Sequence, residues 1–513
     1  MTEINNYSMF FIPYGFMSPH MDVSLAYLQK EIDAGNKAIV LSCRGGKKIS
    51  CGFNLYGSRS KCNYCKRRST EALNQLVGEF ELIYVDDIYS EQLPKEVDLL
   101  IQRTSNLEDV KALTYKGADI GYAIVSALVS RFRTTSLDDN KKVILKQLAL
   151  GFITAFEVGR LLIEERNVDR TFVFNARLEM TRGFFRACRL SSVTCNVLEV
   201  SQVGSQAMMY ENALPLDLTY SQNLIGKLWN SATKSQLSEA KDFYEKKAKG
   251  IAIHDQVYTA GQKDGMLPRR WDPSLKNVVV FGSSADEFYA IGPDWEFPFY
   301  KNQYDGISKI VNSLSLEKGI HVYLRMHPNL TLLKDTELTR EFELSKEHSN
   351  LTIIEPVDEV SSYALMAAAD KIVTFGSSIG IEAVYWGKTS ILAGNSMYAH
   401  LQGVVRPKSH EELIEQIFHK QLESVNNVGA LMYSNFLLSR GETIQGLVST
   451  VDGVKYSNGY FREVPVRERI LFKFTCLLEN CKNWNTFALA IREFLPNKLK
   501  IALSRIVQRT QES

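Results

Sequence analysis

From Asn277 onward the sequence alternates short apolar runs with segments of helical periodicity, and no other feature constrains the fold as strongly. The apolar runs are "NVVVF", "IHVYL", "LTII", "KIVTF" and "TSILAG", with segments such as "YDGISKIVNSLS" and "SSYALMAAAD" between them. Strands that are apolar along their whole length are buried on both faces, which is typical of a parallel sheet covered by helices on both sides. We therefore predict an α/β domain with such a sheet over residues 266–425.

The first half of the chain repeats this organisation. The run "MFFIPYGF" is followed by a helical segment over residues 23–34 and by "AIVLSC", which together predict a βαβ unit. Further candidate strands are "FELIY", "RTFVF" and "VTCNVLEV". We predict a second α/β domain over residues 1–265, with a mainly helical bridge at 222–265, and a C-terminal helical region over 426–513.

Composition and charge restrict the class of protein. The chain has 513 residues, of which 45% are hydrophobic, so it is long enough for two or three domains with sizeable cores. Its formal net charge of +2 gives no general attraction to polyanions, so we expect no nucleic-acid partner. The sequence contains no apolar run of the ~18–20 residues that a membrane span needs. Since the N-terminus also lacks the pattern of a secretion signal, we expect a cytoplasmic protein.

Three predicted strands of the second domain end in chemically unusual residues. Ser283 and Ser284 follow "VVVFG", His327 follows "VYLRM", and Ser377 and Ser378 follow "IVTFG". Ligands of open parallel sheets bind outside the carboxyl ends of the strands. Glycine allows close approach of the backbone, and serine donates hydrogen bonds, so these strand ends predict an anion site suited to a nucleotide phosphate.

A carboxylate and two basic residues extend this hypothesis. Glu382 lies one turn into the helix predicted after Ser378, where it could accept hydrogen bonds from two ribose hydroxyls. His327 and Arg325 could stabilise the phosphate. The structural alternatives are that the serine caps the helix, that the His-Pro pair forms a turn, and that Glu382 complements the helix dipole.

The motifs "RMHP" and "FGSSIGIEAVYWGK" resemble the C-terminal domain of GT-B glycosyltransferases that make bacterial capsule and lipopolysaccharide. The His-Pro and Ser-Ser pair is similar to that of GT-B sialyltransferases and capsule Kdo transferases, in which it contacts the phosphate of a CMP-activated sugar. In the first half, "FVFNARLEMTRGFFRAC" resembles the strand, "FNGR" and helix of these proteins, with Ala176 where glycine is usual.

This resemblance implies two Rossmann-like domains whose parallel sheets face a central cleft. It implies an enzyme that transfers a sugar from a nucleotide-sugar donor, with CMP among the candidate nucleotides, to a surface polysaccharide or lipid-linked glycan. The implied donor contacts are Ser283, Ser284, Arg325, His327, Ser377, Ser378, Gly380 and Glu382. Asn175 and Arg177 become residues of the cleft. Because no Asp-x-Asp motif occurs in a fitting context, we expect no catalytic metal.

An inverting transfer also needs a base that deprotonates the acceptor hydroxyl. Glu199, which follows the run "TCNVL", is the first candidate, and Asp286, which follows the first FGSS motif, is the second. Further candidates are Glu287, beside Asp286, and His20 and Asp22, which follow the first strand. Three alternative functions stay open at this point. They are a polyol-phosphate transferase of the teichoic-acid type that uses a CDP donor, a nucleotide-sugar epimerase, and a non-catalytic scaffold that binds a metal through thiols.

Two further segments carry hypotheses of their own. Four cysteines cluster within the loop 43–65, and their spacing, which ends in C-x2-C, predicts a structural zinc or iron–sulfur site whose ligands are Cys43, Cys51, Cys62 and Cys65. At the other end, residues 494–511 contain no acidic residue and predict a basic amphipathic helix. Such a helix could lie on the inner face of the cytoplasmic membrane or pack across the two domains.

Overall fold

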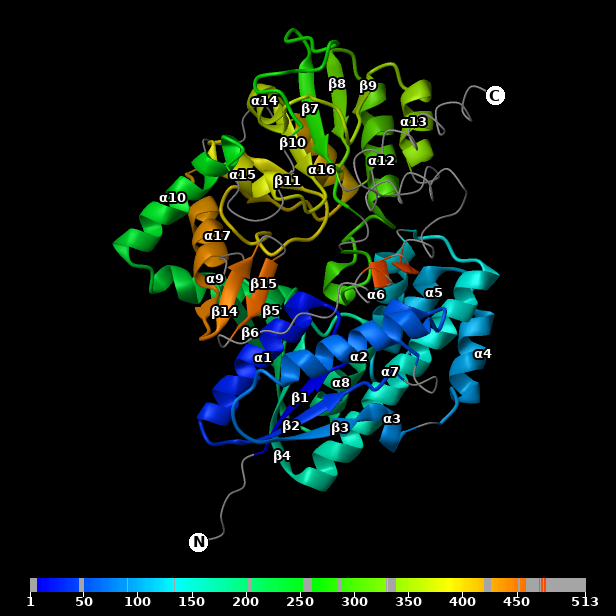
Figure 1. The fold of residues 1–513 in the computed structure, drawn as a ribbon. Coiled ribbons are helices and arrows are strands. Elements are labelled where there is room, and N and C mark those ends of the chain that lie inside the picture. The colour runs from blue at the N-terminus through cyan, green and yellow to red at the C-terminus, as the bar shows by residue number, and fades with distance from the viewer. Residues whose placement is uncertain are drawn as a thin grey trace, which may run out of the picture.

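The computed structural model describes most of the chain, and Figure 1 shows two α/β domains, one above the other. The described residues are 7–45, 50–89, 91–132, 134–201, 205–251, 261–284, 288–328, 330, 338–418, 426–450, 453–457, 470, 472, 473, 475 and 476. Within this described part, no helix is both long enough and apolar enough to cross a membrane. The predicted tail helix at 494–511 lies outside the described residues.

The second domain contains a six-stranded sheet that is parallel throughout. Its strands are β7 (Lys276–Phe281), β8 (Ile320–Arg325), β9 (Leu351–Ile354), β10 (Lys371–Thr374), β11 (Ser390–Leu392) and β12 (Val404–Val405). The covering helices are α12 (Gln303–Ser315), α13 (Leu338–Glu347), α14 (Ser362–Ala368), α15 (Ile379–Tyr385) and α16 (His410–Phe418). The spatial order β9-β8-β7-β10-β11-β12 is that of a Rossmann fold, and it reverses between β7 and β10.

The first domain contains a seven-stranded sheet in which five consecutive strands, up to the edge formed by β3, are parallel. These are β1 (Tyr7–Ile12), β2 (Lys37–Ser42), β3 (Phe80–Tyr84), β4 (Val168–Phe174) and β5 (Thr194–Val200). Their order, β5-β4-β1-β2-β3, reverses between β1 and β4. The strand β6 (Gln206–Glu211) is antiparallel to β5 and extends the sheet. The predicted pair of Rossmann-like domains of the GT-B type is therefore confirmed, with an antiparallel addition at one edge of the first sheet.

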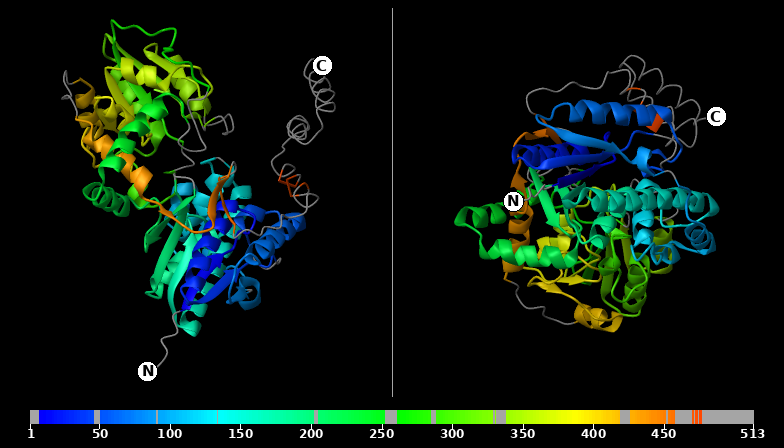
Figure 2. Two further views of the ribbon diagram at one scale, coloured as in Figure 1. Left: turned by 60° about the vertical axis from the view of Figure 1, so that its left-hand side comes forward. Right: turned by 90° about the horizontal axis from the view of Figure 1, so that it is seen from below.

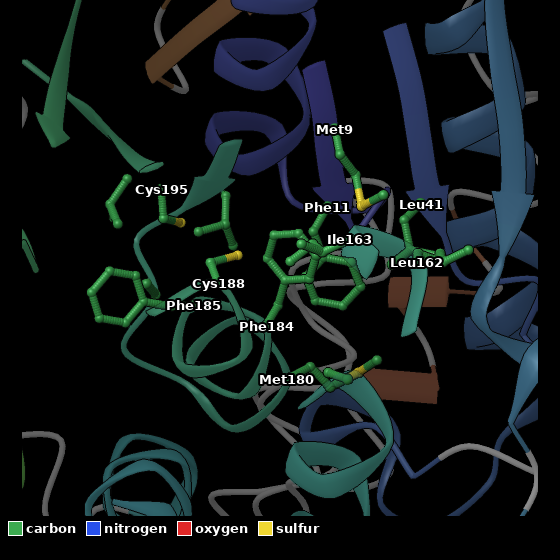
Figure 3. Packing of buried hydrophobic residues seen from close by; sticks show 14 of the residues in the cluster. Met9, Phe11, Leu41, Leu162, Ile163, Met180, Phe184, Phe185, Cys188 and Cys195 are labelled. Atoms are coloured by element: carbon green, nitrogen blue, oxygen red, sulfur yellow. The ribbon is translucent and has the colours of Figure 1, made fainter. Parts of the chain in front are cut away.

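Helices on both faces cover the first sheet. The longer helices are α1 (Ser18–Asp33), α2 (Arg59–Leu73), α6 (Ile120–Phe132), α7 (Asp139–Arg166) and α8 (Glu179–Leu190), and the shorter helices are α3 (Val85–Ile88), α4 (Lys95–Arg103) and α5 (Leu107–Lys111). Figure 3 shows the core beneath the sheet, where Phe184 of α8 stacks on Phe11 of β1 with ring centroids 4.8 Å apart. Gly183 allows α8 to approach α7, because a Cβ there would lie 2.3 Å from the Phe152 carbonyl oxygen. This close packing fixes the turn between β4 and α8.

The helical bridge predicted between the domains is confirmed for its described part. It consists of α9 (Leu218–Asn230) and α10 (Lys234–Ala248), which pack against α17 (Val428–Ser439). Ile225 and Tyr244 of this bridge share one hydrophobic cluster with Ile381 of α15 and Trp295. The helices before residue 265 thus pack with the second domain, although they precede the predicted boundary in sequence.

The C-terminal region departs from the prediction of helices throughout. After α17 the chain forms β13 (Glu442–Thr443), which pairs with β6, and then a hairpin of β14 (Leu447–Thr450) and β15 (Gly453–Tyr456). The hairpin lies beside α1, as the orange and blue ribbons of Figure 2 show. The helical prediction for residues 442–456 is wrong because Ile444, Leu447 and Tyr456 fill the core of the first domain, a contact that local periodicity does not reveal.

Candidate functional site

The two FGSS motifs lie side by side at the point where the order of the second sheet reverses. Strands β7 and β10 are hydrogen-bonded neighbours, with Phe281 opposite Thr374. Beyond the strand ends, the Ser283 hydroxyl donates to the Phe375 carbonyl oxygen over 3.1 Å. The Gly282 N–H donates to the Arg325 carbonyl oxygen of β8, also over 3.1 Å. The three strand ends that the sequence singled out therefore form one continuous edge.

The serines of the two motifs have different surroundings. Ser283 and Ser284 are buried, and the Gln303 side chain pairs with both the N–H (2.7 Å) and the carbonyl oxygen (3.2 Å) of Ser283. Ser377 is partly exposed and Ser378 is exposed. In the described part of the chain no hydrogen bond is present at the Ser377 hydroxyl, whereas the Ser378 hydroxyl donates to Glu382 over 2.8 Å. The first motif therefore orders the loop, whereas the serines of the second motif are accessible at the surface.

Two glycines of the second motif are required by close contacts. Gly376 has φ +113°, and a Cβ there would lie 2.8 Å from the Asn395 carbonyl oxygen. Gly380 is packed so tightly that a Cβ would lie 2.7 Å from the Tyr398 hydroxyl oxygen. Gly380 was predicted as a ligand contact, and the structure gives it a packing role against the strand layer. The helix α15 that follows has seven residues, so its dipole contributes little to anion binding.

Glu382 lies in a dense network of donors. Its Oε1 accepts hydrogen bonds from Lys247 Nζ (2.6 Å) and Ser378 Oγ (2.8 Å), and its Oε2 accepts one from the Tyr363 hydroxyl (2.6 Å). The side chain is only 4% exposed. Burial opposes ionisation, but the charge and hydrogen bond of Lys247 outweigh it and lower the pKa of Glu382. The carboxylate predicted to clamp a ribose is thus charged and already bound by groups of the protein.

The two basic residues at the end of β8 also differ. The Arg325 guanidinium is buried and donates to the carbonyl oxygens of Glu355 (2.8 Å) and Asp358 (3.3 Å), so it orders the loop after β9. His327 lies just beyond the strand and is partly buried. Burial and then the nearby Arg325 charge lower the pKa of His327 to about 4. At neutral pH His327 is therefore an uncharged imidazole that can donate one N–H to an anion.

Two predicted residues of the first domain meet at its own strand ends. Asn175 follows β4 and donates through Nδ2 to Glu199 Oε2 of β5 over 2.5 Å, and the Val200 N–H donates to Oε1 over 2.9 Å. Burial raises the pKa of Glu199, while these hydrogen bonds act in the opposite direction. Ala176 has φ +52°, the left-handed conformation that explains why glycine is usual at this position in the proteins that the segment resembles. Arg177 donates through Nε to the Ser126 hydroxyl over 2.6 Å.

The structure also shows an acidic residue that the sequence reasoning missed. Glu179, the first residue of α8, is fully buried and accepts hydrogen bonds from the Gly52 N–H (2.8 Å) and the Tyr14 hydroxyl (3.1 Å). Its Oε2 has no hydrogen-bond partner among the described residues, and burial raises its pKa. The sequence feature that could have identified Glu179 is the segment "FNARLE", in which an acidic residue follows the strand and turn. Asp286, the second candidate base, lies outside the described residues.

The four cysteines of the loop 43–65 lie in one neighbourhood as free thiols. Burial raises the pKa of Cys43 and Cys51, and that of Cys65 to about 11, and each of the three is further raised by a neighbouring thiol of the group. Within the described part of the chain, however, no group of three or more His, Cys, Asp or Glu side chains is arranged to hold a metal ion. A zinc or iron–sulfur site at these cysteines stays a prediction.

Comparison with known proteins adds likenesses of fold only. No family model matches the chain, and no curated protein is significantly similar to it. Among solved structures, the KpsC β-Kdo 2,4 transferase of Thermosulfurimonas dismutans is 16% identical, with a TM-score of 0.35 over 52% of this chain and 79% of the other. MurG of Acinetobacter baumannii is 10% identical, with a TM-score of 0.25 over 86% and 97%. S. aureus MnaA, in a structure with UDP, is 11% identical, with a TM-score of 0.26 over 83% and 94%.

Proposed function

We propose that the protein is a glycosyltransferase that moves a sugar from a nucleotide-sugar donor to a glycan of the bacterial cell surface. One observation carries the proposal. Both FGSS motifs lie at the carboxyl ends of β7 and β10, the two strands between which the order of the second sheet reverses. Open α/β sheets bind their ligands in this position, and nucleotides are the ligands most often found there.

The chemistry assigned to this edge is stabilisation of the departing phosphate. In the transfer step the acceptor oxygen forms a bond to the anomeric carbon, and the bond from that carbon to the donor phosphate oxygen breaks. The pair of electrons of the broken bond stays on the phosphate. The exposed hydroxyl of Ser377 and the N–H of neutral His327 are the donors assigned to that developing charge.

The acceptor proton needs a base, and the best placed one in the first domain is Glu199. Burial raises its pKa, which makes the carboxylate a stronger base, and Asn175 fixes the orientation of that carboxylate. With Glu199 as the base, the proposed reaction is an inverting transfer, and the proton of the acceptor hydroxyl moves to Glu199. The acceptor that we propose is a surface polysaccharide or a lipid-linked glycan.

A panel of donors tests the proposal. The protein is incubated with CMP-, UDP- and GDP-sugars and with a CDP-polyol, first with and then without a glycan acceptor, and the products are separated by mass spectrometry. A transferase consumes one donor in proportion to acceptor and releases its nucleotide. Interconversion of the donor sugar without acceptor would identify an epimerase instead, and polyol-phosphate transfer from a CDP donor would identify the teichoic-acid type. A protein that binds and consumes no nucleotide donor would overturn the proposal.

A further inference from the structure

A lysine from outside the predicted nucleotide domain reaches the exposed Ser378. Lys247 lies in the last turn of α10, and its Nζ is 2.6 Å from Glu382 Oε1 and 3.3 Å from Ser378 Oγ. Figure 1 shows α10 and α15 next to each other at one side of the second domain, with α17 beside them. This contact could not be predicted from the sequence, because Lys247 and Ser378 are 131 positions apart.

The surroundings fix the position of this ammonium group. The Glu382 carboxylate, which is 4% exposed, lies behind it as a counter-charge. The Tyr363 hydroxyl binds the other oxygen of Glu382 over 2.6 Å, so the carboxylate cannot turn without losing a hydrogen bond. An ion pair whose acid is held in this way presents its cation in one defined place, at small cost in side-chain entropy.

Lys247 retains the capacity to bind a further group. An ammonium group has three N–H donors, and Glu382 and Ser378 account for two of them. The Lys247 side chain is 37% exposed, so the third donor has access to solvent. Glu382, the buried partner, is negative, and Lys247, the accessible partner, is positive, so the solvent-exposed ammonium group attracts anions. The Ser378 hydroxyl donates its proton to Glu382, so Lys247 is the donor of this group that is available to an anion.

We propose that Lys247 binds a phosphate of the nucleotide-sugar donor and that Glu382 positions Lys247 for this purpose. The inference rests on the proposed function and specifies a contact within it. Glu382 then acts through Lys247, in place of the ribose contact that the sequence suggested. The site takes a nucleotide through its phosphate charge, and the bridge helix α10 becomes part of the donor site.

The test compares a nucleotide with its nucleoside, because only the phosphate distinguishes the two. Binding of CMP and cytidine, and of UDP and uridine, is measured by calorimetry for the wild type, Lys247→Met and Lys247→Arg. Lys247→Met should weaken binding of the nucleotide about ten- to a hundredfold, the size expected for loss of a charge-assisted hydrogen bond. Nucleoside binding should be unchanged, and Lys247→Arg should restore part of the nucleotide affinity.

Lys246→Met is the matched control. Lys246 is the adjacent residue of α10, is 53% exposed and lies 3.9 Å from Asp242, so its loss should leave both affinities unchanged. Glu382→Gln should weaken nucleotide binding in the same direction as Lys247→Met, again without an effect on the nucleoside. Thermal unfolding of each variant shows whether the fold is retained. If Lys247→Met does not fold, Lys247→Arg serves as the test variant.

The possible results separate the inference from the function on which it rests. If the wild type binds none of the nucleotides, both are overturned. If Lys247→Met binds nucleotide as tightly as the wild type does, the inference is overturned and the proposed function stands. Equal weakening of nucleotide and nucleoside would also overturn it, because Lys247 would then serve only to hold α10 against α15.

Discussion

At the scale of single residues, the pair of Asn175 and Glu199 gives the sharpest prediction for catalysis. Glu199→Gln should lower kcat by about 10²–10⁴-fold, the usual contribution of a general base. Because burial raises the pKa of Glu199, activity should rise with pH through a value above the ordinary 4.5 of a glutamate. Asn175→Ala removes a hydrogen bond that stabilises the carboxylate, so it should move this limb of the pH–rate profile to higher pH. If Asn175→Ala does not shift the pH–rate profile, or if Glu199→Gln keeps full activity, Glu199 is not the base.

His327 carries a second prediction at this scale. Since its pKa is about 4, the imidazole is neutral over the pH range in which the protein would work, and it acts by donating an N–H. His327→Ala should cost about 10²–10³-fold in kcat, as loss of one donor to a developing negative charge does elsewhere. His327→Gln keeps an N–H donor and should retain more activity. Equal activity of the wild type and both variants would remove His327 from the phosphate site.

At the scale of elements, the two FGSS loops allow a matched comparison of glycines. Gly376→Ala should destabilise the protein by about 1–3 kcal/mol, because alanine is strained in a left-handed conformation and its Cβ would collide with the Asn395 carbonyl oxygen. Gly282→Ala is the control, since the nearest atom to a Cβ there is 3.6 Å away. Denaturant unfolding measures both. Similar losses of stability would show that the second loop is not held in this conformation.

Strands β7 to β11 of the second domain could be predicted from sequence because each is a short, largely apolar run, whereas the two-residue strand β12 was not predicted. The order of the strands then brings Ser283 and Ser377 to one edge by topology alone. The function of individual residues at that edge could not be predicted in the same way. Arg325 and Ser283 are polar residues at strand ends, yet both bind backbone groups of neighbouring loops. Lys247 was missed because its partners are distant in sequence, and Glu179 was missed because its burial depends on Tyr14 and Gly52, which are also distant in sequence.

At the scale of the whole molecule, the chain crosses from the second domain back to the first after α17. The strand β13 of this return segment was missed because it pairs only with β6, and the hairpin of β14 and β15 was missed because it packs against α1, which is distant in sequence. Tyr456 donates its N–H to Asp22 of α1 over 3.0 Å, and Ile444 is 4% exposed in the core of the first domain. The first domain therefore depends on residues near the other end of the chain.

Ile444→Ala measures this dependence. It should destabilise the first domain by about 2–5 kcal/mol, the usual effect of removing a buried isoleucine side chain. Val448→Ala is the control, because Val448 is 43% exposed on the same segment and should change stability by less than about 0.5 kcal/mol. Fluorescence-monitored unfolding in urea should show the difference. Equal effects of the two substitutions would mean that the return segment does not contribute to the core.

The central claim is that a nucleotide binds where the order of the second sheet reverses, and hydrogen exchange with and without CMP or UDP tests it most directly. Bound nucleotide should slow amide exchange in the peptides that contain residues 282–284 and 376–378, because ligand contact lowers the frequency of local opening. Peptides that cover β12 and α16 should exchange at unchanged rates and serve as the internal reference. The account predicts protection concentrated at the two FGSS loops. Protection confined to the strand ends of the first domain, around residues 13–17 and 175–179, or no protection anywhere, would contradict it.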